Sequence, residues 1–164
     1  MHDLRIRLAT DADLPSINRI YNHYVLTSTC TYQTAPETPE GRAAWFGGHG
    51  PTHPITVAEQ AGQVLGWGSL SRYHPRAAWG RTVEDSVYVD AGHQRRGIGR
   101  ALLADLVQRG AAVGHHAIIA GIDAEQTGSV ALHAAEGFVP VGRLREVGFK
   151  FGRWLDVIYM QRVL

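Results

Sequence analysis

The sequence predicts a single α/β domain in which helices cover both faces of a mixed β-sheet. The first observation is the order of strand-type and helix-type segments, which is β-α-α-β-β-β-α-β-α-β-β along the chain. The second is continuity, because the 164 residues contain no repeat, no low-complexity segment and no long linker. A chain of this length can bury a core without disulfides. We therefore expect one domain over residues 1–164.

The opening strand and the first helix are predicted from two different periodicities. Residues 4–9, LRIRLA, alternate between apolar and polar side chains, as a strand does. Residues 10–26 offer Thr10 or Asp11 as a cap and then repeat apolar residues at helical spacing. The apolar stripe of this predicted helix consists of Leu14, Ile17, Ile20, Tyr21 and Tyr24.

A loop, a second helix and a hairpin are expected next. Residues 27–39 are polar and predict a loop. The second helix begins at Thr38 and Pro39, because proline at the first helical position gives up no hydrogen bond, and it ends near Gly47–Gly48. Residues 54–73 contain two β-type runs around Ala61-Gly62, which predicts a hairpin.

The second half of the chain alternates between strands and helices. Residues 81–89 and 115–123 are predicted strands, and residues 97–112 and 127–138 are predicted helices. Gly137 closes the second of these helices. Residues 145–151 and 154–164 are predicted to form a final antiparallel pair.

The composition excludes several classes of function. The formal net charge is only +1, so no overall charge favours nucleic acid or a membrane surface. No apolar run approaches the roughly 20 residues that span a bilayer, and the N-terminus lacks the apolar core of a signal peptide. Cys30 is the only cysteine, which rules out an internal disulfide and favours a packing role for this residue. The histidines show no metal-ligand spacing. We expect a cytoplasmic protein without a metal.

The segment Gln94–Gly99 joins a predicted strand to a predicted helix and has the composition of an anion site. A helix N-terminus offers unpaired N–H groups and the positive end of a dipole. Gly97 and Gly99 allow close approach of a ligand, while Arg95 and Arg96 add positive charge. Such a turn suits a pyrophosphate, although a tight turn with solvated arginines would look the same. A Walker A loop and a Rossmann fingerprint are both excluded, since neither motif is complete here.

Four blocks in the same order resemble a known family. These blocks are TVEDSVYV, HQRRGIGRALL, SVALHAAEGF and LREVGFKFGRWLD, and they span most of the chain. The pattern Q-x-x-G-x-G resembles the acetyl-coenzyme A motif of the GNAT N-acetyltransferase superfamily, and the blocks resemble its phosphinothricin and methionine sulfoximine branch. The resemblance implies the GNAT fold with a splayed strand pair. It also implies direct acetyl transfer from acetyl-CoA to a small amine, and a homodimer with the pocket near the interface.

The resemblance also implies which residues contact the coenzyme. Main-chain groups of Val87, Tyr88 and Val89 would meet its pantetheine arm, unless that strand is paired normally. Gln126 stands where relatives more often have asparagine, and its amide keeps a donor and an acceptor with a longer reach. The remaining coenzyme contacts implied are Gln94, Arg95, Arg96, Gly97, Ile98, Gly99, Arg100 and Ser129.

Glu84 and His133 are the candidate catalytic residues. An amine nucleophile must lose a proton, and Glu84 shares a strand face with Thr82, Ser86 and Tyr88, which could line a cleft. The alternative for Glu84 is an ordinary surface glutamate. The resemblance makes His133 a candidate acid for the departing thiolate, and the alternative is a half-buried histidine with a structural hydrogen bond.

The residues predicted to recognise the substrate differ in type from those of the relatives. The resemblance places His74, Arg76 and Trp79 where the branch has two basic residues and an aromatic. Arg76 suits an oxyanion, because a guanidinium binds one with two parallel hydrogen bonds. His74 is charged only part of the time near neutral pH, and Trp79 lacks a hydroxyl group. Tyr32 resembles an aromatic residue that closes over the substrate in this branch. The alternative is that its ring only packs against other side chains.

Two further expectations concern the assembly and the function. The aromatic residues Phe149, Phe151 and Trp154 of the closing hairpin would lie at a subunit interface or in the core. The favoured acceptor is an amino-acid analogue such as phosphinothricin, methionine sulfoximine or arsinothricin. Acetylation of another amine or of a protein N-terminus, and a non-catalytic acetyl-CoA-binding module, are the alternatives.

Overall fold

The computed structural model describes residues 3–164, which form one seven-stranded sheet. Its strand order is β1-β2-β3-β4-β5-β7-β6. The strands are β1 (Arg5–Leu8), β2 (Ile55–Gln60), β3 (Gln63–Arg72), β4 (Thr82–Val89), β5 (Ala117–Asp123), β6 (Val139–Lys150) and β7 (Arg153–Val163). The α-helices are α1 (Leu14–Thr27), α2 (Pro39–Gly47), α3 (Ile98–Ala112) and α4 (Thr127–Ala135). The expected order of strands and helices is confirmed.

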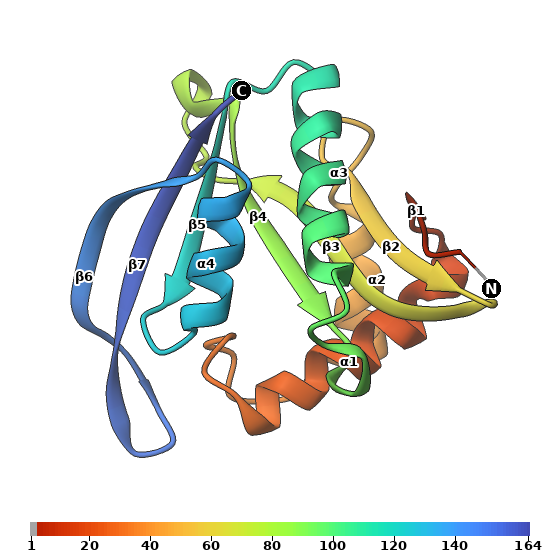
Figure 1. Cartoon of the computed structure of the whole chain (residues 1–164), viewed down its shortest axis with the longest axis horizontal. Helices are drawn as coiled ribbons and strands as arrows, with labels where there is room; N and C mark the ends of the chain where they lie inside the picture. The colour runs from red at the N-terminus through yellow and green to blue at the C-terminus, as the bar shows by residue number, and fades with distance from the viewer. Residues whose placement is uncertain (1–2) are drawn as a thin grey trace.

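Helices cover both faces of the sheet, as the apolar periodicity predicts (Figure 1). On one face, Leu103 and Leu106 of α3 pack against Val83 of β4 and Ile118 of β5. On the other face, α1 packs its expected apolar stripe against the inner residues of β2 and β3. Burial on both faces explains the apolar runs in β3 and β5, whereas β4 carries Glu84, Asp85 and Ser86 beside the point where it leaves β5. The molecule therefore has three layers.

Local sequence signals explain most of the element boundaries. The Thr38 hydroxyl accepts the Gly41 N–H at 3.0 Å, and Pro39 follows at the first helical position. The hairpin between β2 and β3 turns at Ala61 and Gly62, whose φ angles of 52° and 77° are those of a type I′ turn. Both features are confirmed as predicted.

Two boundaries differ from the prediction. The helix α1 begins at Leu14 with Asp13 at its cap position, and not directly after Thr10 or Asp11, because a short 3₁₀ turn at Asp11–Asp13 precedes it. Asp13 is buried there and pairs with Arg7 of β1 at 2.8 Å, which joins this turn to the sheet. The strand β6 begins at Val139 rather than residue 145. A register shift between Leu144 and Gly148 interrupts it, which hides the regular strand pattern in the sequence.

The strands β4 and β5 separate within the sheet. Their parallel pairing consists of Thr82 with Ala117, Val83 with Ile118 and Glu84 with Ile119. Both strands then continue unpaired with each other, and Figure 1 shows them diverging toward the start of α3. This is the splayed pair that the resemblance implied. Glu84 is the last paired residue of β4, so it lies where the gap opens.

Candidate active site

One cavity of about 840 Å³ runs from the beginning of α3 through the gap between β4 and β5 to Glu84. Its walls come from the loop at residues 28–32, from β4, from the turn before α3, and from β5 and α4. The elements that form it are distant in sequence. The splayed strands bring them together because the gap leaves the middle of the sheet open.

The turn before α3 presents main-chain donors to this cavity. Arg95 and Gly97 have φ angles of 59° and 80°, and Gly97 caps the helix. The first hydrogen bond of the helix runs from Ala101 N–H to Gly97 C=O, so the N–H groups before it have no helical partner. Within residues 3–164, the N–H groups of Ile98 and Gly99 make no hydrogen bond. This geometry can bind an oxyanion at the positive end of the helix dipole.

Three side chains of this turn and of the first turn of α3 have other partners. Arg100 donates to Glu136 at 2.8 Å, and Arg96 reaches Gln60 at 3.4 Å. Gln94 donates its amide to the Tyr24 hydroxyl at 2.6 Å. Of the expected basic residues, Arg95 and Arg100 line the cavity. Arg95 makes no side-chain hydrogen bond or ion pair within residues 3–164, so its guanidinium and the main chain are the groups available to an anion.

The unpaired edge of β4 is the second source of main-chain groups. Asp90 donates its N–H to Leu65 of β3, and main-chain groups alternate sides along a strand, so those of Val87 and Val89 face the gap. The Val89 carbonyl accepts from the Tyr24 hydroxyl at 2.5 Å. Tyr88 directs its main chain toward β3, and its ring stacks on Trp67 with centroids 5.0 Å apart. Val87 thus offers both of its polar groups to a ligand in the gap.

Glu84 has the environment of a base. Its side chain is half-buried, and among the described residues its carboxylate makes no hydrogen bond or ion pair. A Cβ atom added to Gly121 would lie 3.3 Å from Glu84 Oε1 and 3.4 Å from the Tyr159 ring, so a larger residue there would crowd this carboxylate. Burial, and then the nearby charge of Asp85, raise the pKa of Glu84. A raised pKa favours proton exchange near neutral pH.

Asp85 and His133 form a buried pair beside Glu84. His133 is 4% exposed; its Nε2 lies 2.9 Å from Asp85 Oδ2, and its Nδ1 lies 2.7 Å from the Ser129 carbonyl oxygen. Burial lowers the pKa of His133, but hydrogen bonding and attraction from Asp85 outweigh it and raise that pKa. Both ring nitrogens therefore already have protein partners. The sequence prediction missed Asp85, although an acidic residue in the core-facing column of Val83 and Val87 was a usable signal.

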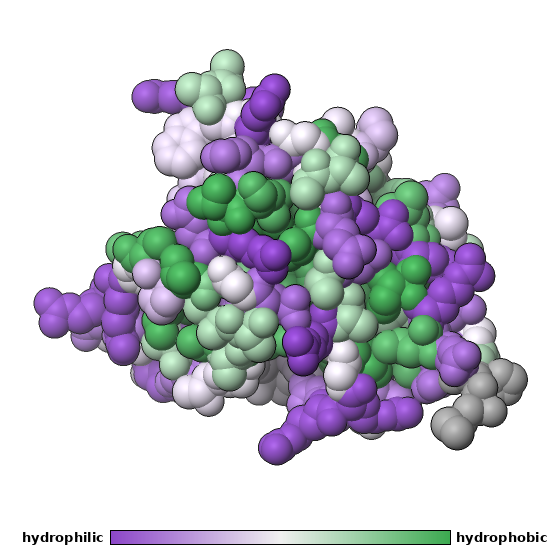
Figure 2. Space-filling model, turned by 45° about the horizontal axis from the view of Figure 1, so that its top comes forward, coloured by the Kyte–Doolittle hydropathy of each residue, from purple (hydrophilic) through white to green (hydrophobic). Residues whose placement is uncertain are grey.

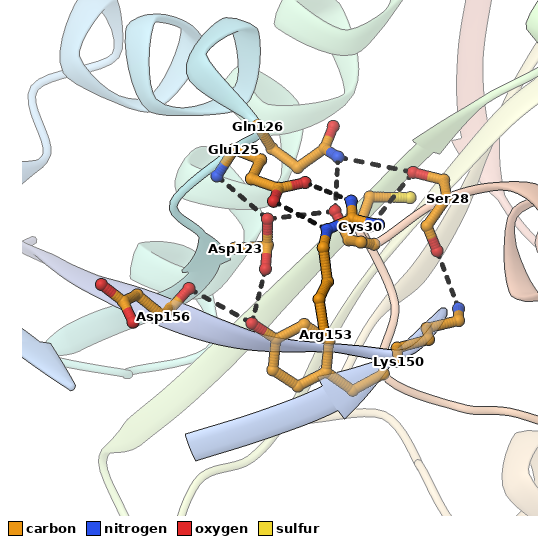
Figure 3. Close-up of polar contacts among 10 residues, drawn as sticks. Ser28, Cys30, Asp123, Glu125, Gln126, Lys150, Arg153 and Asp156 are labelled. Carbon is orange, nitrogen blue, oxygen red and sulfur yellow. Dashed lines mark hydrogen bonds and ion pairs between the residues drawn. The ribbon is translucent and has the colours of Figure 1, made fainter. Parts of the chain in front are cut away.

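The loop at residues 28–32 is fastened over the cavity by side chains from three elements (Figure 3). Tyr32 donates its hydroxyl to Asp123 at 2.6 Å. Gln126 donates to Thr29 at 3.0 Å, so its amide holds this loop. Lys150 is 5% exposed and donates to the carbonyl oxygens of Ser28 and Thr31 at 2.7 Å each. Cys30 is half-buried in the same loop, and burial raises its pKa.

His74, Arg76 and Trp79 lie apart from this cavity. They belong to the segment between β3 and β4, where Arg76 N–H donates to His74 Nδ1 at 3.2 Å and the His74 and Trp79 rings are 5.2 Å apart. Trp79 is 41% exposed. The structure brings Glu84, His133, Tyr32 and the coenzyme-site candidates to one cavity, except that Arg96 lies outside its lining.

Two structural findings bear on other classes of function. No helix within residues 3–164 has the length and apolarity needed to cross a membrane. In the same part of the chain, no group of three or more His, Cys, Asp or Glu side chains is arranged to hold a metal ion.

Comparisons with known proteins agree with this geometry. The phosphinothricin N-acetyltransferase of Alcaligenes faecalis is 42% identical over 161 residues, which is 97% of this chain and 82% of that protein. The L-methionine sulfoximine/L-methionine sulfone acetyltransferase of Salmonella typhimurium is 36% identical, over 96% of this chain and 93% of that protein. The solved structure of a GNAT superfamily phosphinothricin acetyltransferase from Sinorhizobium meliloti in complex with AcCoA superimposes with a TM-score of 0.95. It is 40% identical and covers 98% of this chain and 88% of its own.

The family model described as Acetyltransferase (GNAT) family matches residues 17–138. This range extends from α1 to the end of α4 and includes the turn before α3, the splayed strands and Glu84. The chain therefore belongs to the GNAT family of acetyltransferases.

Proposed function

We propose that this acetyltransferase moves an acetyl group from acetyl-CoA to the primary amine of a small amino-acid analogue, with Glu84 as the general base. The observation that carries the proposal is the shared cavity. It joins the unpaired N–H groups at the start of α3 to the unpaired carboxylate of Glu84. The coenzyme's diphosphate would bind at the helix end, and the gap beside Val87 would hold the pantetheine arm.

The chemistry requires one proton acceptor and one oxyanion donor. Glu84 accepts a proton from the substrate ammonium, directly or through water, and the freed nitrogen forms a bond to the thioester carbonyl carbon. The Val87 N–H faces the gap and can stabilise the negative charge that develops on the carbonyl oxygen. The carbon–sulfur bond then breaks, the new amide nitrogen loses its second proton, and the departing thiolate takes up that proton. His133 reaches this thiolate only if its pairing with Asp85 or Ser129 changes, because both ring nitrogens are engaged.

The relatives support an acceptor that carries an amine and an acidic or strongly polar group. Phosphinothricin and methionine sulfoximine, which the names of two relatives contain, share the α-amino acid group. Tyr32 lines the cavity near the acceptor side. His74, Arg76 and Trp79 would contact the acceptor if the segment between β3 and β4 closes over it, or if they reach the site of a partner subunit.

We also propose that the enzyme acts as a homodimer through the β6 edge. This strand ends the sheet, and large apolar side chains are exposed on the hairpin it forms with β7. They are Val139, Val141, Leu144, Val147, Phe149, Phe151 and Trp154. The view in Figure 2 is turned about the horizontal axis from that in Figure 1, so the β6 and β7 side of the molecule stays on the left. Apolar side chains are visible at the surface there. An exposed apolar edge strand can pair with a second copy of the chain. The cavity lies beside this edge, because Val157 and Tyr159 of the neighbouring strand β7 line it.

An acceptor screen tests the enzymatic proposal. Purified protein, acetyl-CoA and a panel of amino-acid analogues are mixed, and the release of free thiol is followed. Glu84→Gln should reduce the rate for the best acceptor about 100- to 10,000-fold, the range expected for loss of a general base. Glu125→Gln is the matched control, since Glu125 lines the same cavity, pairs with Arg153, and is not assigned a chemical role. Full activity of Glu84→Gln at neutral pH would refute the base assignment.

A further inference from the structure

Tyr159 of β7 lies on the same face of the sheet as Glu84. Gly121 of β5 is paired with Tyr159 in the antiparallel register, and paired residues share a face. Glu84 of β4 is paired with Ile119, which precedes Gly121 by two positions on β5, so Glu84 lies on that face as well. The proposed catalytic step gave no role to Tyr159.

This shared face is open at Gly121. The alternate residues of the same strands, such as Ala120 and Met160, point to the other face and belong to the core that α3 covers. Gly121 is exposed, Glu84 and Tyr159 are half-buried, and all three line the catalytic cavity. An acceptor whose amine meets Glu84 on this face therefore has Gly121 and the Tyr159 ring beside it.

The missing side chain at Gly121 allows the phenol ring to approach the carboxylate. A Cβ atom placed on Gly121 would lie 3.3 Å from Glu84 Oε1 and 3.4 Å from Tyr159 Cε1. It would lie 3.9 Å from Tyr159 Cζ, the carbon that carries the hydroxyl group. The carboxylate and the ring thus flank the same point above Gly121. The charge of Glu84 is accordingly the second cause, after burial, of the raised pKa of Tyr159.

The Tyr159 hydroxyl is a donor without a protein partner. Within residues 3–164 it makes no hydrogen bond. Burial and the charges of Glu84 and Tyr73 raise its pKa, so the phenol stays protonated at neutral pH and can donate. Tyr32, at the same cavity, instead donates its hydroxyl to Asp123. The Tyr159 hydroxyl is therefore available to a bound acceptor.

The chemistry of the acceptor determines which of its groups this hydroxyl meets. In an α-amino acid the amine and the carboxylate are attached to the same carbon atom, so an amine held at Glu84 brings the carboxylate close to Tyr159. A hydroxyl group makes a short, charge-assisted hydrogen bond to a carboxylate oxygen. It adds no positive charge, so neutralising the acceptor still requires a cation, and the exposed Arg76 between β3 and β4 is a candidate for that role.

We propose that the Tyr159 hydroxyl binds the α-carboxylate of the acceptor and thereby selects α-amino acids over simple amines. This inference rests on the proposed function, because it takes Glu84 as the site of the amine. It adds a contact from β7 to those expected from the segment between β3 and β4. The carboxylate keeps its charge throughout acetyl transfer, so the hydrogen bond stabilises the bound acceptor and the transition state equally. Its loss should therefore change KM and not kcat.

Two amines that differ by the α-carboxylate test the proposal. L-phosphinothricin is assayed as the acceptor with wild type, Tyr159→Phe and Tyr73→Phe. Its decarboxylated analogue, 3-aminopropyl(methyl)phosphinic acid, is titrated as a competitive inhibitor, which measures its affinity whether or not it is acetylated. Loss of a hydrogen bond to a charged group should raise the KM of Tyr159→Phe for phosphinothricin about 10- to 100-fold with little change in kcat. The inhibition constant of the analogue should stay the same.

Tyr73→Phe is the matched control. Tyr73 contributes to the raised pKa of Tyr159 but lies outside the cavity lining, so this variant should change neither constant. Tyr159→Phe removes a single oxygen atom from a half-buried side chain, so it should fold as the wild type does.

Three outcomes would overturn the proposal and leave the proposed function intact. They are an unchanged KM for phosphinothricin in Tyr159→Phe, equal losses of affinity for both amines, and a loss confined to kcat with a shifted acidic limb of the pH–rate profile. The last outcome would mean that the hydroxyl acts on Glu84 rather than on the acceptor. A wild-type enzyme that releases no thiol with phosphinothricin or with methionine sulfoximine would overturn both proposals.

Discussion

Replacing Asp85 by asparagine tests the buried pair with His133. The Ser129 carbonyl oxygen can only accept, so His133 Nδ1 must carry a proton. The Nε2–Asp85 contact of 2.9 Å therefore requires either a charged ring beside a carboxylate, or a neutral ring that accepts from a protonated carboxyl group. In both cases one extra proton is shared. An asparagine amide can donate to the neutral ring, but it cannot stabilise the charged one.

The loss of stability expected for Asp85→Asn follows from the burial of the pair. The two side chains are 5% and 2% exposed, so water screens them little. Removing one partner of a buried ion pair costs about 3 kcal/mol, which corresponds to roughly 6–12 °C in Tm for a domain of this size. That loss applies where the ring is charged. Where the ring is neutral, the amide keeps a hydrogen bond and the loss falls to about 1 kcal/mol or less.

The raised pKa of His133 determines at which pH the substitution costs more stability. The folded pKa of His133 is raised above its ordinary value of 6.5, so the pair's contribution is complete below that value and is lost as pH rises through the folded pKa. Urea unfolding of both proteins at about pH 5.5 and about pH 8.5 should therefore show a larger deficit for Asp85→Asn at the lower pH. Asp105→Asn, which breaks a surface pair with Arg109, is the matched control and should cost no more than about 0.5 kcal/mol.

The same substitution has a kinetic consequence. The Asp85 charge is the second cause of the raised pKa of Glu84, after burial. Asp85→Asn should therefore lower the pKa of Glu84 and move the acidic limb of the kcat/KM profile to lower pH. A stability deficit that does not vary with pH, together with an unmoved acidic limb, would refute the shared-proton reasoning.

Glycine substitutions supply two further predictions. Gly121→Ala places a methyl group 3.3 Å from Glu84 Oε1, so it should dehydrate that carboxylate, raise its pKa and move the acidic limb of the pH–rate profile upward. Gly128→Ala, whose added Cβ meets nothing within 4 Å in the same cavity, should leave the profile unchanged, and equal behaviour of the two variants would contradict the assigned contact. Gly97→Ala strains a residue with φ 80° at the start of α3 by roughly 1–2 kcal/mol and should weaken acetyl-CoA binding measured by calorimetry. Gly114→Ala, with φ 91° away from the cavity, should lose comparable stability without losing affinity, and similar affinity losses in both variants would count against the helix-end site.

Local chemistry made much of the fold predictable from the sequence. Thr38 and Pro39 start a helix through contacts within one turn, and Ala61-Gly62 turns a hairpin by itself. The apolar stripes of α1 and α3 predicted which helix faces are buried. The unpaired N–H groups beside Gly97 follow from any helix start, so the anion site was also within reach of sequence reasoning.

Partners distant in the chain limited the prediction of side-chain roles. Gln94 and Gln126 carry amides that could contact a ligand, but the fold brings Tyr24 to one and Thr29 to the other. Arg76 looks like an anion site in sequence, whereas Arg42 looks like an ordinary helix residue. No local pattern shows that Arg42 is buried against the rings of Tyr21 and Trp45.

The sequence by itself determined the order of the elements, their buried faces and the donor-rich turn before α3, because these depend on residues within a few positions of one another. Only the tertiary structure decided at which residue β4 and β5 separate, that Asp85 meets His133, and that Arg42 lies buried against the rings of Tyr21 and Trp45. The physical reason is that hydrogen-bond satisfaction and burial of charge are settled between elements once the layers pack, and these interactions leave no periodic trace in the chain.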